Sequence, residues 1–332
     1  PINFNPFAEV IYKKSLKNYI FWIISYILSP VVVPLRLIIC FFGMYFVQLV
    51  GKPLTKEIDI NKPLHPIRKK IIEKILQISA KIIMFSLGYF KINEKNIQFK
   101  PDLEKGYVAI SNHICAMDPV CLISRGFVSF VAKEEIKKFP FFGFGTWIGQ
   151  GIFVKRGDKT HGEKSAKEIQ NRICGDVQQY GIPRKYPMLV IFPESTTVNQ
   201  TALLPFKKGA FISGKPVSMM AIYYGGNFDH SDTSCPLFKA QLKSLIGLWN
   251  NVTIEYFGDY YPNEAEQQDH FLYAENVRSF YSQRLGWPKA DCSLTDKFYF
   301  SKRHDNYELC SDFFKQNYGK DAKRSSKYVV YA

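Results

Sequence analysis

The stretch Ser111-Asn112-His113-Ile114-Cys115-Ala116-Met117-Asp118-Pro119 decides how the rest of the chain is interpreted. It follows an apolar run, 107–110, that is typical of a strand. Asp118-Pro119 is typical of a helix start, because an acidic residue suits the positive end of a helix and proline needs no amide donor there. The chain between them can fold back, so that Asp118 accepts a hydrogen bond from one imidazole nitrogen of His113. The other nitrogen is then free to act as a general base. Taken alone, a His-x4-Asp spacing is common by chance, so other segments must support it.

Apolar runs alternate with helical stretches from residue 88 onward, which indicates an α/β domain. We expect strands at 107–111, 127–132, 151–155, 188–192, 217–223 and 252–257. We expect helices at 118–124, 133–138, 162–180 and 265–285.

Polar residues follow several of these strands. The strand 151–155 delivers Lys155 and Arg156, and the strand 188–192 is followed by Pro193, Glu194 and the hydroxyl residues 195–197. In an open α/β sheet, sites form at the carboxyl ends of strands. A base, a phosphate-binding arginine and a carboxylate are therefore expected at one edge of the sheet.

A long apolar run lies near the N-terminus. Residues 20–50 carry a single charge, Arg36, and as one helix they would be ~46 Å long, beyond a ~30 Å hydrocarbon core. Pro30 and Pro34 lie in the middle, where proline breaks helices. We therefore predict two helices, about 17–31 and 35–50, that form a hairpin dipping into one membrane leaflet. Lysines flank both ends and favour one side of the membrane for both. A buried soluble hairpin is the alternative.

A linker and a further helix are predicted between this hairpin and the α/β domain. Residues 52–66 hold three prolines and resemble a linker, and 67–87 show isoleucines at helical spacing between lysines, which predicts an amphipathic helix. That helix either packs on the domain or lies on the membrane. The predicted domains are the anchoring hairpin 1–51, the linker and amphipathic helix 52–87, the catalytic domain 88–294, and a polar C-terminal extension 295–332.

The charge and hydrophobic content of the chain limit the classes of molecule that it is expected to bind. The net charge is +15 and 46% of residues are hydrophobic, which suits an anionic membrane surface, a phosphate-bearing substrate or nucleic acid. The basic residues are scattered and no recognition motif occurs, so we expect no nucleic-acid partner. The seven cysteines form no C-x-x-C and no Cys/His cluster. They are expected to be reduced thiols in a cytosol-like compartment, with no metal site.

The motifs in order resemble those of the glycerolipid (PlsC-type) acyltransferase family. They are His-x4-Asp, Phe-Val-Lys-Arg at 153–156, Phe-Pro-Glu-x-Thr at 192–196 and Lys-Pro-Val at 215–217. Within that family the chain looks most like the lysophosphatidylcholine acyltransferases. This closer likeness rests on the segments 192–201, 206–211, 255–264 and 273–278, and on residues 5–7 and 33–37 near the N-terminus. The resemblance covers about residues 3–290.

The resemblance implies a mixed sheet flanked by helices, and acyl transfer from acyl-CoA to a lysophospholipid, with no other cofactor. His113 would be the base and Asp118 would orient it. Arg156 would hold the lysolipid phosphate, with a surface position as its alternative. Glu194 would serve acceptor binding or, alternatively, start a helix. Thr196 would be a hydroxyl donor to the substrate, and Lys155 either contributes to substrate binding or is solvated.

Lysophosphatidylcholine is the favoured acceptor, and lysophosphatidate or glycerol 3-phosphate is the alternative. Ser195 stands where the family usually has glycine. If that position needs a positive φ, serine costs about 1 kcal/mol or more. This departure keeps open a structural or lipid-binding subunit of a membrane complex, docked through the tyrosine-rich C-terminal extension. An endoplasmic reticulum or lipid-droplet membrane fits the family, and a mitochondrial membrane is the alternative.

Overall fold

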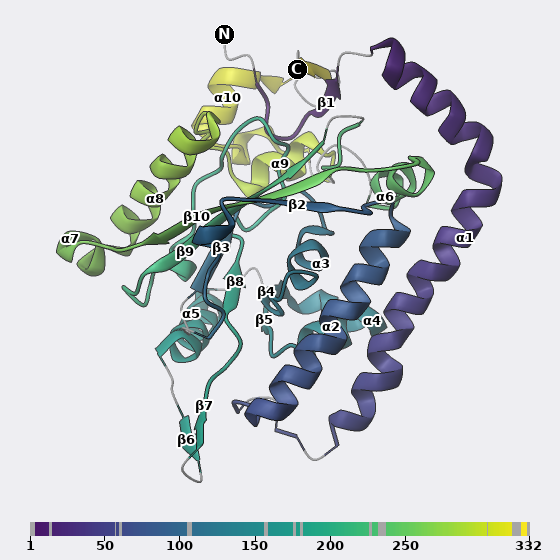
Figure 1. Ribbon diagram of the computed structural model, residues 1–332. Helices are drawn as coiled ribbons and strands as arrows, with labels where there is room; N and C mark the ends of the chain where they lie inside the picture. Colours follow the sequence, from purple (N-terminus) through teal and green to yellow (C-terminus); the bar gives the residue numbers. More distant parts are fainter. Residues whose placement is uncertain are drawn as a thin grey trace.

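A seven-stranded sheet forms the centre of the computed structural model (Figure 1). The structure describes residues 4–12, 15–56, 58–59, 62–104, 108–155, 159–174, 177–179, 182–225, 228–231, 237–303, 305–320 and 327–330. In spatial order the strands are β2 (Ile92–Lys95), β10 (Val252–Tyr260), β9 (Val217–Tyr224), β3 (Val108–Ser111), β8 (Leu189–Ile191), β4 (Ser129–Lys133) and β5 (Ile152–Val154).

The sheet is mixed. Strands β9, β3, β8, β4 and β5 are mutually parallel, β10 runs antiparallel to β9, and β2 runs parallel to β10. The predicted α/β class, with a mixed sheet flanked by helices, is confirmed, and so are all six predicted strands. Strand β2 was missed because its sequence, INEK, has one buried residue, Ile92, and gives no clear alternation.

Alternate residues of the central strands face two helical layers. Ala109 of β3 packs in a cluster with α2 (Pro66–Ser86) and α3 (Asp118–Ile123). Its neighbours Val108 and Ile110 pack in another cluster, with α5 (Lys159–Cys174) and α8 (His270–Leu285). The sheet is therefore buried on both faces, which explains the nearly continuous apolar runs of its parallel strands.

Several expected helices differ in detail from the structure. The helix expected at 133–138 is the 3-10 helix η2 (Glu134–Lys138), since Lys133 still belongs to β4, and α5 ends at Cys174, short of the expected 180. The segment 265–285 is divided at Asp269, whose side chain caps the start of α8. The other described elements are β1 (Glu9–Tyr12), β6 (Val177–Gln179), β7 (Ile182–Arg184), β11 (Lys327–Val330), α4 (Pro140–Ile148), α6 (Leu237–Ile246), α7 (Glu264–Gln268), α9 (Leu294–Phe300), α10 (Asp312–Tyr318), η1 (Ile97–Phe99), η3 (Lys208–Ala210) and η4 (Tyr307–Leu309).

The N-terminal apolar run is one helix, α1 (Leu16–Leu54), so the predicted break at Pro30–Pro34 is wrong. Pro30 leaves the Tyr26 carbonyl without its usual amide donor. The Ser29 hydroxyl donates to that carbonyl instead, at 2.8 Å. A helix pair does exist, but it consists of α1 and α2, which run antiparallel side by side (Figure 1).

Close packing joins the two helices of this pair. The Ser79 hydroxyl donates to the Gly43 carbonyl at 2.7 Å, and a Cβ atom at Gly43 would lie 2.9 Å from Cγ2 of Ile82. The opposite face of α1 is exposed, with Ile27, Val31 and Leu49 each at least 70% accessible. By length and composition α1 is apolar enough to cross a membrane. The predicted amphipathic helix at 67–87 is confirmed as α2.

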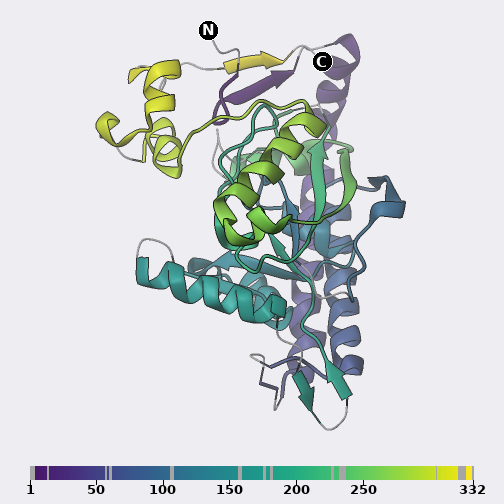
Figure 2. The same ribbon diagram turned by 90° about the vertical axis from the view of Figure 1, so that its left-hand side faces the viewer.

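The C-terminal segment returns to the domain instead of extending away from it (Figure 2). Phe314 of α10 and Tyr299 of α9 are buried in a cluster with Phe7 and the loop residues Val198 and Leu204. Tyr307 and Tyr318 pack against the same cluster. Most of the predicted tail between 295 and 320 is therefore folded against the rest of the chain. Its proposed docking to a partner protein stays a prediction.

Arg36, the single charge of the apolar run, ties α1 to the domain. Its guanidinium donates to the carbonyl oxygens of Leu245, Gly247 and Leu248 at 2.6–2.8 Å, and more weakly to Ser244 at 3.4 Å. These carbonyls belong to the end of α6 and the turn after it, where helix carbonyls lack intrahelical partners and attract cations. Arg36 is only 7% exposed. It is a structural cap.

Replacing Arg36 with leucine should lower the free energy of unfolding by about 2–4 kcal/mol, because several buried carbonyls lose a charged donor. Arg68→Leu, at an exposed position of α2, is the control and should change it by less than about 0.5 kcal/mol. Chemical unfolding in detergent measures both. Equal losses in the two variants would contradict the capping role.

Candidate active site

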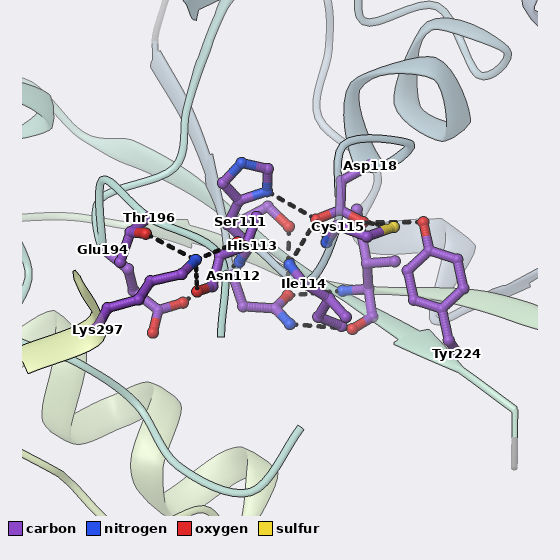
Figure 3. Close-up of polar contacts among 12 residues, drawn as sticks. Ser111, Asn112, His113, Ile114, Cys115, Asp118, Glu194, Thr196, Tyr224 and Lys297 are labelled. Atoms are coloured by element: carbon purple, nitrogen blue, oxygen red, sulfur yellow. Dashed lines mark hydrogen bonds and ion pairs between the residues drawn. The ribbon is translucent and has the colours of Figure 1, made fainter. Parts of the chain in front are cut away.

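His113 and Asp118 form a dyad at the carboxyl end of β3 (Figure 3). His113 Nδ1 lies 2.8 Å from Asp118 Oδ2. The same carboxyl oxygen accepts the main-chain N–H groups of Ile114 and Cys115, at 2.6 and 3.0 Å. Since Oδ2 acts as acceptor in these contacts, Nδ1 carries the imidazole proton. The Nε2 lone pair is left to accept a proton from another molecule.

The second oxygen of Asp118 is held from the opposite side. The Tyr224 hydroxyl donates to Oδ1 at 2.8 Å, and the Cys115 thiol lies 3.4 Å from it. Asp118 is fully buried, and a carboxyl group in such a place needs these donors. Burial, followed by the nearby Asp118, raises the pKa of Tyr224 well above its usual value. Tyr224 therefore remains a proton donor at any physiological pH.

Two neighbours fix the histidine itself. The His113 ring stacks on Phe192, with centroids 4.1 Å apart and planes 15° apart. The preceding Asn112 is buried, and its side-chain amide exchanges two hydrogen bonds with the main chain of Ile222 in β9. His113 keeps a side-chain exposure of 19%. The ring is thus oriented by protein contacts while part of the side chain stays accessible.

Glu194 lies next to His113 because β3 and β8 are neighbouring parallel strands. Its Oε1 accepts the His113 N–H at 3.3 Å and its Oε2 accepts the Leu204 N–H at 3.0 Å. Burial raises the pKa of Glu194 to about 7, against the opposing effect of these two amides. Both carboxyl oxygens are engaged by main chain, so in this structure Glu194 supports the loop that carries the histidine.

Ser195 adopts the left-handed conformation, with φ 57°. The condition on which the expected cost of a serine depended, a positive φ at this position, is therefore met. The next residue, Thr196, is 7% exposed, and its hydroxyl accepts a hydrogen bond from Lys297 Nζ at 3.1 Å. Glu194 and Thr196 thus share the turn that follows β8, and Glu194 Oε1 connects this turn to the main chain of His113 in the loop after β3.

Of the two basic candidates, the structure describes only Lys155. Lys155 is exposed at the end of β5, the edge strand, which β4 separates from β8. Arg156 lies outside the described residues. Among the residues that the structure describes, no group of three or more His, Cys, Asp or Glu side chains is arranged to hold a metal ion.

Tyr224 and Lys297 are site residues that the sequence reasoning missed. Ser111, the last residue of β3, pairs with Met220 of β9, and β9 continues four residues further to Tyr224. The sequence signal available for Tyr224 was its position at the end of β9, the strand beside β3, which leads into His113. Lys297 gave none, because its contact with Thr196 depends on how the chain returns about a hundred residues later.

Comparison with known proteins agrees with the motifs. Residues 90–220 match the family model described as Acyltransferase. The human lysophospholipid acyltransferase LPCAT4 is 27% identical over 297 residues, which cover 89% of this chain and 55% of that protein. Lysophosphatidylcholine acyltransferase 1 of Danio rerio is 28% identical over 303 residues, which cover 88% and 55%. The chain spans about half the length of these relatives.

A solved structure is also similar. It is the crystal structure of the 1-acyl-sn-glycerophosphate acyltransferase PlsC from Thermotoga maritima, 17% identical, with a TM-score of 0.48, covering 82% of this chain and 97% of that one. The predicted resemblance rests on the family model and the sequence relatives, which confirm it. The matched region contains His113, Asp118, Glu194 and Thr196, whereas Tyr224 and Lys297 lie beyond it.

Tyr224→Phe should lower the free energy of unfolding by about 1–3 kcal/mol, because a buried acceptor of Asp118 loses its donor. The matched control is Tyr223→Phe on the same strand. Tyr223 donates to Glu255, which also accepts from Asn96, so the loss there should be under about 1 kcal/mol. Chemical unfolding monitored by circular dichroism compares the two, and a smaller loss at Tyr224 would refute the assignment.

Proposed function

We propose that this protein is an acyl-CoA-dependent O-acyltransferase that acylates a lysophospholipid, with lysophosphatidylcholine as the favoured acceptor. The observation that carries the proposal is the His113–Asp118 pair, in which Nδ1 is held at 2.8 Å from Asp118 Oδ2 and 19% of the His113 side chain is exposed. The relatives named for lysophospholipids support the substrate class.

In the proposed reaction the acceptor hydroxyl loses its proton to His113 Nε2 as its oxygen attacks the thioester carbonyl carbon of acyl-CoA. A tetrahedral intermediate forms and its C–S bond then breaks. The coenzyme A thiolate leaves and takes the proton from the imidazolium. Asp118 stabilises the imidazolium and keeps the ring in the productive tautomer. Positioned proton transfer of this kind contributes roughly 10²–10⁴-fold in rate.

The remaining residues serve binding and support. Arg156 is proposed to bind the acceptor phosphate, because a planar guanidinium suits two oxygens, with Lys155 assisting it. Thr196 offers a hydroxyl near the dyad. Glu194 acts by holding the His113 main chain. The reaction needs no cofactor besides its co-substrate acyl-CoA.

Membrane attachment through α1 fits this reaction, since both proposed substrates carry long apolar chains. The exposed face of α1 has large apolar side chains along its length, and burying such surface in lipid is favourable. Lys17 and Lys52, near its two ends, suit anionic headgroups. The compartment remains a prediction.

The test is acyl transfer from labelled acyl-CoA by the purified protein in detergent, with lysophosphatidylcholine, lysophosphatidate and glycerol 3-phosphate as acceptors. His113→Ala should lower transfer by roughly 10²–10⁴-fold, because the base is lost. The control His270→Ala, at the start of α8, should retain transfer.

The outcomes separate the candidates. Preference for lysophosphatidate or glycerol 3-phosphate would change the proposed acceptor but leave the assignment as an acyltransferase in place. Undiminished transfer by His113→Ala would refute the assigned base. No transfer by a folded wild-type protein would overturn the enzyme and favour the alternative, a structural or lipid-binding subunit of a membrane complex.

A further inference from the structure

A lysine from the C-terminal segment reaches the turn that follows β8. Lys297 of α9 is 7% exposed, and its Nζ lies 3.1 Å from Thr196 Oγ1, 2.6 Å from Thr197 Oγ1 and 2.7 Å from the Thr197 carbonyl oxygen (Figure 3). Three oxygens thus match the three protons of the ammonium group. Lys297 lies outside the matched acyltransferase region, 90–220.

This turn is attached to the catalytic histidine on both sides of Thr196. Before it, Glu194 Oε1 accepts the His113 N–H at 3.3 Å. After it, the Val198 N–H donates to the His113 carbonyl at 2.9 Å. Thr196 is therefore held at a fixed place relative to the dyad, in the middle of a segment whose two ends contact the main chain of His113.

The contact with Lys297 determines whether the Thr196 and Thr197 hydroxyls act as donors or as acceptors there. A threonine hydroxyl both donates and accepts, and an ammonium group only donates. Thr196 Oγ1 and Thr197 Oγ1 accept from Lys297, so each keeps its own proton for another acceptor. Within the part of the chain that the structure describes, no hydrogen bond uses the Thr196 proton. Hydrogen bonds polarise one another in a low-dielectric site, so the ammonium charge makes these hydroxyls stronger donors.

The lysine is itself held rigidly. Ser293 and Asp296 form a capping box at the start of α9. Asp296 also accepts the main-chain and side-chain groups of Ser311, at 2.7 Å each, so the segments on both sides of η4 are tied together. The whole unit packs on Phe7 and Val198. Lys297 is therefore presented to the turn by a folded element with its own core.

We propose that Lys297 is a positioning residue, which prepares the Thr196 and Thr197 hydroxyls to donate to a phosphate oxygen of the acceptor lipid. Phosphate is the chemistry that suits this site, because it offers only acceptors to two hydroxyl donors that lie beside a positive charge. This inference rests on the proposed function, and it assigns the C-terminal segment a part in acceptor recognition.

The experiment measures KM for lysophosphatidylcholine and for acyl-CoA separately, and kcat, in the purified protein. Lys297→Met should raise KM for lysophosphatidylcholine about tenfold, while KM for acyl-CoA and kcat stay within about twofold, because only binding of the acceptor phosphate is lost. Lys297→Arg keeps the charge and donors and should restore most of the affinity. Lys302→Met, an exposed lysine just after α9, is the control.

Threonine variants separate positioning from mere stability. Replacing Thr196 and Thr197 by valine should raise the same KM, and adding Lys297→Met should then have little further effect, since the lysine acts through the hydroxyls. The threonine replacement by itself still tests the inference if Lys297→Met unfolds the protein. A tenfold rise in KM for acyl-CoA instead, fully additive effects, or unchanged KM in every variant would overturn the inference. Absence of transfer by the wild-type protein would refute the proposed function itself, and the inference with it.

Discussion

The buried carboxyl group of Asp118 is the constraint on which the site depends. It is fully excluded from solvent, so its oxygens need donors from the protein. The donors come from the imidazole of His113, two amides of the connecting loop, and the Tyr224 hydroxyl of β9. Satisfying one buried group thus fixes the loop after β3 and its contact with the neighbouring strand. It also fixes the tautomer of the histidine.

Further contacts join the turn after β8 and the helix α1 to the domain that carries the dyad. Glu194 holds the main chain of His113, and Lys297 holds the turn that follows Glu194. Arg36 attaches the long apolar helix α1 to the end of α6. The apolar helix and the turn after β8 are therefore joined to the same domain. A membrane-bound α1 would hold the site at a fixed distance from lipid.

Much of this could be predicted from sequence because the signals are local. The six predicted strands are short apolar runs bounded by polar residues, and the His-x4-Asp fold-back needs only a strand end and a helix start. The positive φ of Ser195 is consistent with the glycine usual at this position in the family that the chain resembles. The dyad and the Glu194 turn come together because the parallel strands β3 and β8 end at the same edge.

The failures have equally physical causes. Proline was expected to break the apolar run, but Ser29 supplies the donor that the Tyr26 carbonyl needs, and packing on α2 supports the helix. The C-terminal segment lacks a hydrophobic period, yet several of its aromatic residues pack with Phe7 from the opposite end of the chain. Lys297 acts through a contact between segments about a hundred residues apart, which no local pattern reveals, whereas Tyr224 was marked only by its place at the end of a predicted strand.

The most direct test of the account is acyl transfer by Asp118→Asn, a replacement of nearly the same shape. The amide cannot accept all the donors that the carboxyl group accepts, so the ring of His113 loses its fixed tautomer. The account predicts that kcat/KM falls by roughly 10²–10⁴-fold in a protein that remains folded by circular dichroism. Transfer by this variant at nearly the wild-type rate would contradict the claim that Asp118 orients a catalytic base.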